Sequence, residues 1–183
     1  MATLAEVHDT VRRLHVPAGI REESTLARID YADTFVVDVG GSGRCTAEAW
    51  ARTAMEGAPL GMRARLLSGW TALGLKLAIS KPEAVLGWEI RRNAPDAVLL
   101  AADGRLGLAG ELLFRREGDD LRFATFVRID NRAARLAWGR VEGVHDPVVR
   151  SLLARVHRDR VTRSDPEGMA PRAAMSGANT MTP

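Results

Sequence analysis

The 183-residue chain contains few of the side chains that most readily identify a chemistry. Cys45 is its single cysteine, which excludes an intramolecular disulfide and any cysteine-based zinc site. A lone cysteine is typical of a reducing compartment, so we expect a cytoplasmic protein. Lysine is scarce as well. Only Lys76 and Lys81 occur, and the sequence pI of about 9.7 therefore comes from arginine.

The distribution of charge and of apolar residues argues against two classes of partner. The net charge is only +3, and the arginines alternate with Asp and Glu instead of forming a basic stripe with stacking aromatics. The most apolar window, Leu66 to Ile79, is shorter than the roughly 20 residues of a membrane-spanning helix and contains Lys76. We therefore expect no nucleic-acid partner and no stable membrane insertion.

The common catalytic and cofactor motifs are missing too. The stretch Gly40 to Gly43 lacks the Gly-Lys-Ser/Thr ending of a phosphate-binding loop and the spacing of a dinucleotide loop. No Gly-x-Ser-x-Gly nucleophile elbow occurs. His8 and His15 lie seven residues apart, too far for one shared metal ion. The sequence thus predicts no catalytic residues, no metal and no cofactor.

Alternation of apolar and polar residues predicts an antiparallel sheet. In a first strand from Asp30, one side collects Tyr31, Asp33, Phe35, Val37 and Val39. Two helices follow, from Thr46 to Glu56 and from Met62 to Ile79. Four more strand candidates are separated by turn sequences, and they cover residues 85–92, 96–102, 105–116 and 119–129. In the strand 105–116, Leu112 and Phe114 lie on the face opposite Glu111. In the strand 119–129, Phe123 and Thr125 lie on the face opposite Arg122.

A long helix is predicted from Asn131 to Arg158. Its apolar stripe consists of Ala134, Trp138, Val141, Val148, Leu152 and Val156, and only the sheet offers a surface large enough to cover that stripe. Pro147 predicts a bend or interruption near Asp146. The resulting organisation is an amphipathic N-terminal segment (1–19, helical over its first fifteen residues), a single domain (20–158) and a disordered tail (159–183).

This order of elements resembles the START-like or SRPBCC superfamily. The likeness is greatest in Phe123-Ala124-Thr125-Phe126-Val127-Arg128, followed by Asn131, Ala134, Arg135, Trp138, Val144-His145 and Pro147, which resemble an uncharacterised bacterial family of that superfamily. It spans Tyr31 to Arg158 and implies an α+β helix-grip fold, a curved antiparallel sheet wrapped around the C-terminal helix, with two helices after the first strand. Because such sheets usually have six or seven strands, either a further strand lies between Ile20 and Ile29 or the sheet is short.

The resemblance also implies a ligand cavity between the sheet and the long helix. Its lining would comprise Trp88, Phe114, Phe123, Thr125 and Trp138, with His145 at its mouth. The alternative is that these side chains are ordinary core residues that fill the space.

Three functions follow as expectations. The first is binding of an apolar small molecule, lipid-like or polyketide-like, without catalysis. The second is a cyclase or dehydratase in which Glu111, Thr125 or His145 moves a proton inside the cavity. The third is a protein-interaction module that uses the apolar helix Met62 to Ile79. The oligomeric state is not predicted.

Overall fold

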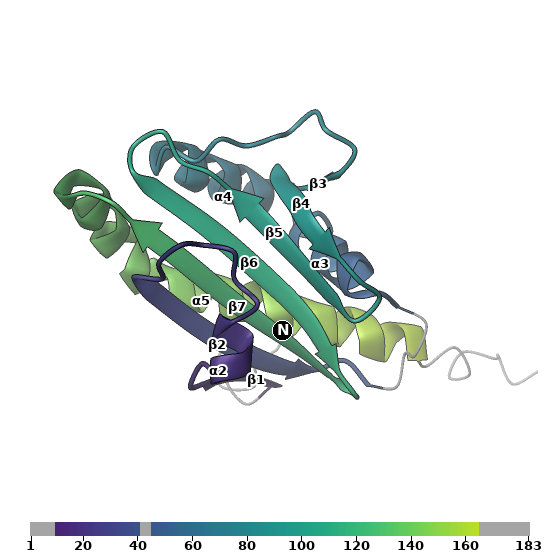
Figure 1. Cartoon of the computed structure of the whole chain (residues 1–183). Coiled ribbons are helices and arrows are strands. Elements are labelled where there is room, and N and C mark those ends of the chain that lie inside the picture. Colours follow the sequence, from purple (N-terminus) through teal and green to yellow (C-terminus); the bar gives the residue numbers. More distant parts are fainter. Residues whose placement is uncertain (1–9, 41–44, 165–183) are drawn as a thin grey trace, which may run out of the picture.

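The computed structural model describes residues 10–40 and 45–164, and it is an α+β fold with one antiparallel sheet (Figure 1). The sheet has seven strands in the order β1-β2-β7-β6-β5-β4-β3. The strands are β1 (Val11–Leu14), β2 (Tyr31–Asp38), β3 (Ala84–Val85), β4 (Trp88–Asn93), β5 (Ala97–Ala102), β6 (Leu108–Glu117) and β7 (Asp120–Ile129). The helices are α2 (Ala18–Arg21), α3 (Ala47–Met55), α4 (Leu60–Ala72) and α5 (Arg132–Ser164). His8 and residues 165–183 of the predicted tail lie outside the described residues.

The five predicted strands are present, and two short strands complete the sheet. Residues 11–14 were predicted as helix but form β1, in which the side chain of Val11 is fully buried and pairs with Val37 of β2. That prediction was wrong because pairing with a strand edge outweighed a weak helical spacing. β3 is the other addition. It arises because a turn at residues 86–87 divides the predicted strand 85–92, so that Val85 belongs to β3 and residues 88–92 to β4. Residues 20–29 contribute no strand.

The second predicted helix is shorter than expected. It ends at Ala72, and Leu75 then forms a bridge with Gly104. Gly74 has a positive φ of 79°, the left-handed conformation in which helices commonly stop. The chain beyond it therefore leaves the helix and runs beside the β5–β6 connection.

The two faces of the sheet have different covers. Three helices, α3, α4 and α5, lie on one face, which we call the helix face (Figure 1). Residues 16–29, which we call the strap, cover the other face, where Val16 and Ile20 pack with Leu113 and Phe126. The predicted alternation is confirmed, because Leu112, Phe114, Phe123 and Val127 belong to the core of the helix face.

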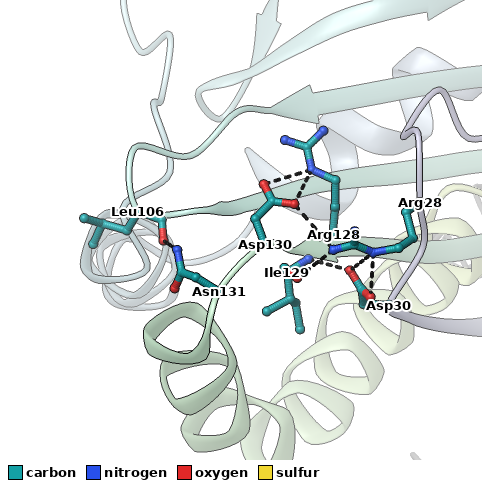
Figure 2. A network of polar contacts seen from close by, with 7 residues as sticks. All are labelled: Arg28, Asp30, Leu106, Arg128, Ile129, Asp130 and Asn131. Atoms are coloured by element: carbon teal, nitrogen blue, oxygen red, sulfur yellow. Dashed lines mark hydrogen bonds and ion pairs between the residues drawn. The ribbon is translucent and has the colours of Figure 1, made fainter.

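Hydrogen bonds hold the start of α5 in place at the end of β7. The side chain of Asn131 caps the helix by accepting a hydrogen bond from the backbone N of Ala134 (2.8 Å) and donates through Nδ2 to the carbonyl oxygen of Leu106 (3.0 Å; Figure 2). The carboxylate of Asp30 accepts from the backbone N of Ile129 (2.7 Å) and from Arg28. These contacts set the direction in which α5 crosses the sheet.

α5 is continuous from Arg132 to Ser164, although Pro147 lies inside it. The helix is therefore not interrupted near Asp146, whereas a bend there stays a prediction. The helix also extends six residues beyond the predicted end at Arg158. Trp138 is 7% exposed, as predicted for a stripe residue. Val141, Val148 and Leu152 of the same stripe are only partly buried, which leaves them available to line open space.

Candidate functional site

A polar cluster lies within the apolar core of the helix face. Strands β2 and β7 pair so that Asp33 is directly opposite Thr125, and both side chains point toward α5. Tyr31 precedes Asp33 on the same face of β2, and its hydroxyl donates to Oδ2 of Asp33 (2.7 Å). Both Asp33 and Thr125 are buried, with 2% and 3% exposure.

α5 supplies the imidazole of this cluster. His145 follows Trp138 by seven residues, two helical turns, so both side chains lie on the sheet-facing stripe. Nε2 of His145 lies 3.2 Å from Oδ2 of Asp33 and 3.1 Å from Oγ1 of Thr125. The imidazole side chain is 15% exposed, whereas the Asp33 side chain is inaccessible.

Asp33 is held in its ionised form. Burial by itself raises the pKa of this carboxyl, but the hydrogen bond from His145, the charge of that imidazole whenever it is protonated, and the hydroxyls of Tyr31 and Thr125 bring the pKa below its ordinary value of 3.8. One oxygen, Oδ1, has no hydrogen-bond partner within the described part of the chain. The pKa of Tyr31 is raised, first by burial and then by the adjacent Asp33 charge, so its hydroxyl stays a donor.

Aromatic rings enclose the cluster. The ring centroid of Trp138 lies 4.9 Å from that of Tyr31 and 5.7 Å from that of His145, and the centroids of Tyr31 and His145 are 6.1 Å apart. The imidazole thus has aromatic neighbours on β2 and on its own helix. These contacts hold the ring in place and reduce its access to water.

The space between α5 and the sheet is mostly filled by side chains. Side chains of the described residues enclose cavities of about 50 Å³ there, of which two concern the predicted site. Phe114 and Phe123 line the first, whereas Trp88, Thr125 and Trp138 line the second. His145 lines both. All six residues expected to line a ligand cavity therefore border these spaces, but each cavity has room for little more than one or two waters.

A larger space lies beside α5. The groove between α4 and α5 has a volume of about 460 Å³, and its walls include Leu66 and Trp70 on the α4 side and Val144 and Val148 on the α5 side. His145 is part of its lining too. Trp70 and His145 each border all three spaces, so both side chains lie where the groove comes close to the cavities.

Glu111 is not part of this site, contrary to the expectation that it serves as a cavity acid. Its carboxylate lies under the strap, where it accepts hydrogen bonds from Ser24 Oγ (2.6 Å) and the backbone N of Thr25 (3.0 Å). Glu111 therefore attaches the strap to the sheet.

Sequence reasoning missed the partners of His145. Asp33 and Tyr31 were placed on the apolar side of the first strand, and a carboxylate on such a side is itself the signal that a buried partner exists. The groove residues on α4 had no comparable signal. Their role depends on where α4 packs, which local spacing does not determine.

Comparisons of the chain with known proteins give no information about this site. The chain matches no model of a known protein family, no curated protein and no solved structure. Within the described ranges, no group of three or more His, Cys, Asp or Glu side chains is arranged to hold a metal ion. None of the helices among those residues is long and apolar enough to cross a membrane.

Proposed function

We propose that this protein binds an apolar small molecule in the groove between α4 and α5, with a polar group of the ligand next to His145. The observation that carries this proposal is the groove itself, which combines a volume of about 460 Å³ with largely apolar walls and one imidazole. Typical ligand sites have volumes of roughly 300–1,000 Å³ and a few placed polar groups. The cavities directly beneath α5 are too small for this role.

The weak attachment of α4 supports the proposal. Of its thirteen residues, all of them described, only Leu66 is buried. Trp70 is partly exposed and contacts the ring of Trp88 edge-on, with centroids 5.4 Å apart. Because Trp70 borders the groove and both cavities, a rotation of its side chain or a shift of α4 would join these spaces. A ligand longer than the groove would then reach the sheet.

The helix-grip assignment belongs to the same proposal. An antiparallel sheet with a long C-terminal helix across one face supports a likeness to START-like proteins, as does the passage from β7 into α5. In such an arrangement the ligand lies between the helix and the sheet. Here we place its larger part beside α5, where the open volume is.

The proposal can be tested with an uncharged fluorescent probe, N-phenyl-1-naphthylamine, whose emission rises in apolar surroundings. We expect saturable binding to the purified protein and at least a tenfold weaker affinity for Val144→Lys, because that ammonium group would lie on the groove wall. Val144 is 47% exposed, so the lysine can be solvated and the fold should be retained.

Leu136→Lys is the matched control. Leu136 is on the same helix, is 66% exposed and does not line the groove. The affinity of the Leu136→Lys variant for the probe should equal that of the wild type. Equal loss of affinity in both variants, or no saturable binding to the wild type, would contradict a ligand site in this groove.

A further inference from the structure

The surroundings of His145 determine which ring nitrogen carries the proton. Nε2 faces Oδ2 of Asp33 at 3.2 Å, and an ionised carboxylate only accepts hydrogen bonds. A lone pair on Nε2 would face another lone pair there. In the neutral ring the proton is therefore on Nε2, and the basic lone pair is on Nδ1.

Nδ1 of His145 is available to a ligand. It has no hydrogen-bond partner within residues 10–40 and 45–164. The ring is 15% exposed and borders the groove. A carboxylate that fixes the tautomer of an imidazole and stabilises its protonated form is the arrangement by which proteins make histidine a general base.

The same geometry argues against nucleophilic catalysis by Thr125. Its hydroxyl lies 3.1 Å from Nε2, which is the nitrogen that carries the proton and so cannot remove one from the hydroxyl. The partner that Nδ1 can deprotonate must therefore come from the groove.

We propose that His145 is a catalytic general base that transfers a proton at a carbon next to the carbonyl group of an apolar ketone bound in the groove. This inference rests on the proposed function, since it needs a ligand in the groove. The substrate class follows from two features. The walls are largely apolar, and the single cationic side chain on the described lining, Arg65, can hold the oxygen on which negative charge develops.

The step balances without any co-reactant. The C–H bond breaks and its proton forms an N–H bond at Nδ1, while the electron pair becomes the C=C bond of an enolate whose negative charge lies on oxygen. The imidazolium is stabilised by the Asp33 carboxylate. It then returns a proton to the same carbon, or to the conjugated position, so that the net result is exchange or an isomerisation.

The experiment measures deuterium uptake from D₂O into 2-tetralone, an apolar ketone with an activated methylene group, by mass spectrometry. Binding of the same ketone is measured separately by quenching of tryptophan fluorescence. We expect the wild type to exceed His145→Gln by about 100-fold in exchange rate, the lower end of the usual gain from a general base. His15→Gln, at an exposed position outside the site, should exchange at the wild-type rate.

The outcomes separate the two proposals. If both the wild type and His145→Gln bind the ketone and exchange it at equal rates, the base is refuted while the binding site stands. If the wild type does not bind 2-tetralone, the proposal of a ketone site in the groove is refuted, and the proposal of His145 as its base is refuted as well.

A spectroscopic measurement tests the positioning role of Asp33 independently of substrate. The ¹⁵N shifts of the His145 ring in the wild type should show a proton on Nε2 and none on Nδ1. Asp33→Asn can offer an amide N–H to Nε2, so the proton should move to Nδ1 and the exchange rate should fall. A wild-type ring protonated on Nδ1 alone, or an Asp33→Asn ring with the wild-type tautomer, would overturn the assignment.

Discussion

Asp33 is the residue on which the polar cluster depends. A buried carboxylate is costly unless it is paired and hydrogen-bonded, and here Tyr31 and His145 supply both kinds of contact. The depressed pKa of Asp33 has a direct consequence for stability. Its ionised form contributes stability above the ordinary pKa of 3.8, and this contribution is lost as the pH falls through the lower pKa of the folded state.

The first prediction is therefore a change in acid sensitivity. Asp33→Asn should be less stable than the wild type at pH 7, and its stability should fall less steeply below about pH 4, because the titrating carboxyl is gone. Urea denaturation at a series of pH values measures this. Asp103→Asn, at an exposed position, should keep the wild-type profile. If Asp33→Asn shows the same acid dependence as the wild type, Asp33 does not stabilise the fold in its ionised form.

Trp138 provides the second prediction at this scale. Its indole is 7% exposed and packs on Tyr31, so Trp138→Ala should destabilise the fold by about 3–5 kcal/mol. Leu136→Ala, two residues earlier and 66% exposed, should change stability by less than about 0.5 kcal/mol. Denaturation midpoints of the two variants measure the difference. Equal midpoints would mean that α5 does not pack on the sheet through Trp138.

At the scale of elements, hydrophobic periodicity accounts for most of the fold. The alternation in β6 and β7 and the stripe on α5 are strong local patterns, and the structure confirms both. β1 was missed because four residues carry too little pattern to distinguish a strand from a helix, and its conformation depends on pairing with β2. The end of α4 was also missed, because the bridge between Leu75 and Gly104 joins segments that are distant in the sequence.

Substitution of two glycines, one in α5 and one near its start, should change the stability of the protein in opposite directions. Gly139 lies within the helix and a methyl group there would meet nothing within 4 Å, so Gly139→Ala should stabilise the protein by about 0.5–1 kcal/mol. Gly107 has a φ of 80° and its added methyl group would collide with the side chain of Asn131, so Gly107→Ala should destabilise. The thermal unfolding midpoints of the two variants measure these changes. A lower midpoint for Gly139→Ala would contradict the exposed position of Gly139 and the free space around it.

For the molecule as a whole, the sheet separates two kinds of polar group. Glu111 faces the strap and is fully bonded to it, which makes it structural, whereas Asp33 and His145 face α5 and border open space. The sequence placed Glu111 on the face of its strand opposite Leu112 and Phe114, but it left open whether Glu111 or His145 acts in the cavity. It could not give their partners, because the strap, the position of α4 and the pairing of Asp33 with Thr125 all arise from contacts between distant segments.

The groove between α4 and α5 is the central claim, and it is tested most directly by mapping where an apolar ligand binds. The measurement is a titration of ¹⁵N-labelled protein with N-phenyl-1-naphthylamine, followed through backbone amide shifts. The account predicts that the largest changes lie at Gly69, Val144 and Val148, with further changes at the ring of His145. Changes confined to the polar pocket of about 330 Å³ near Arg63 and Ile79, or no saturable changes at all, would contradict it.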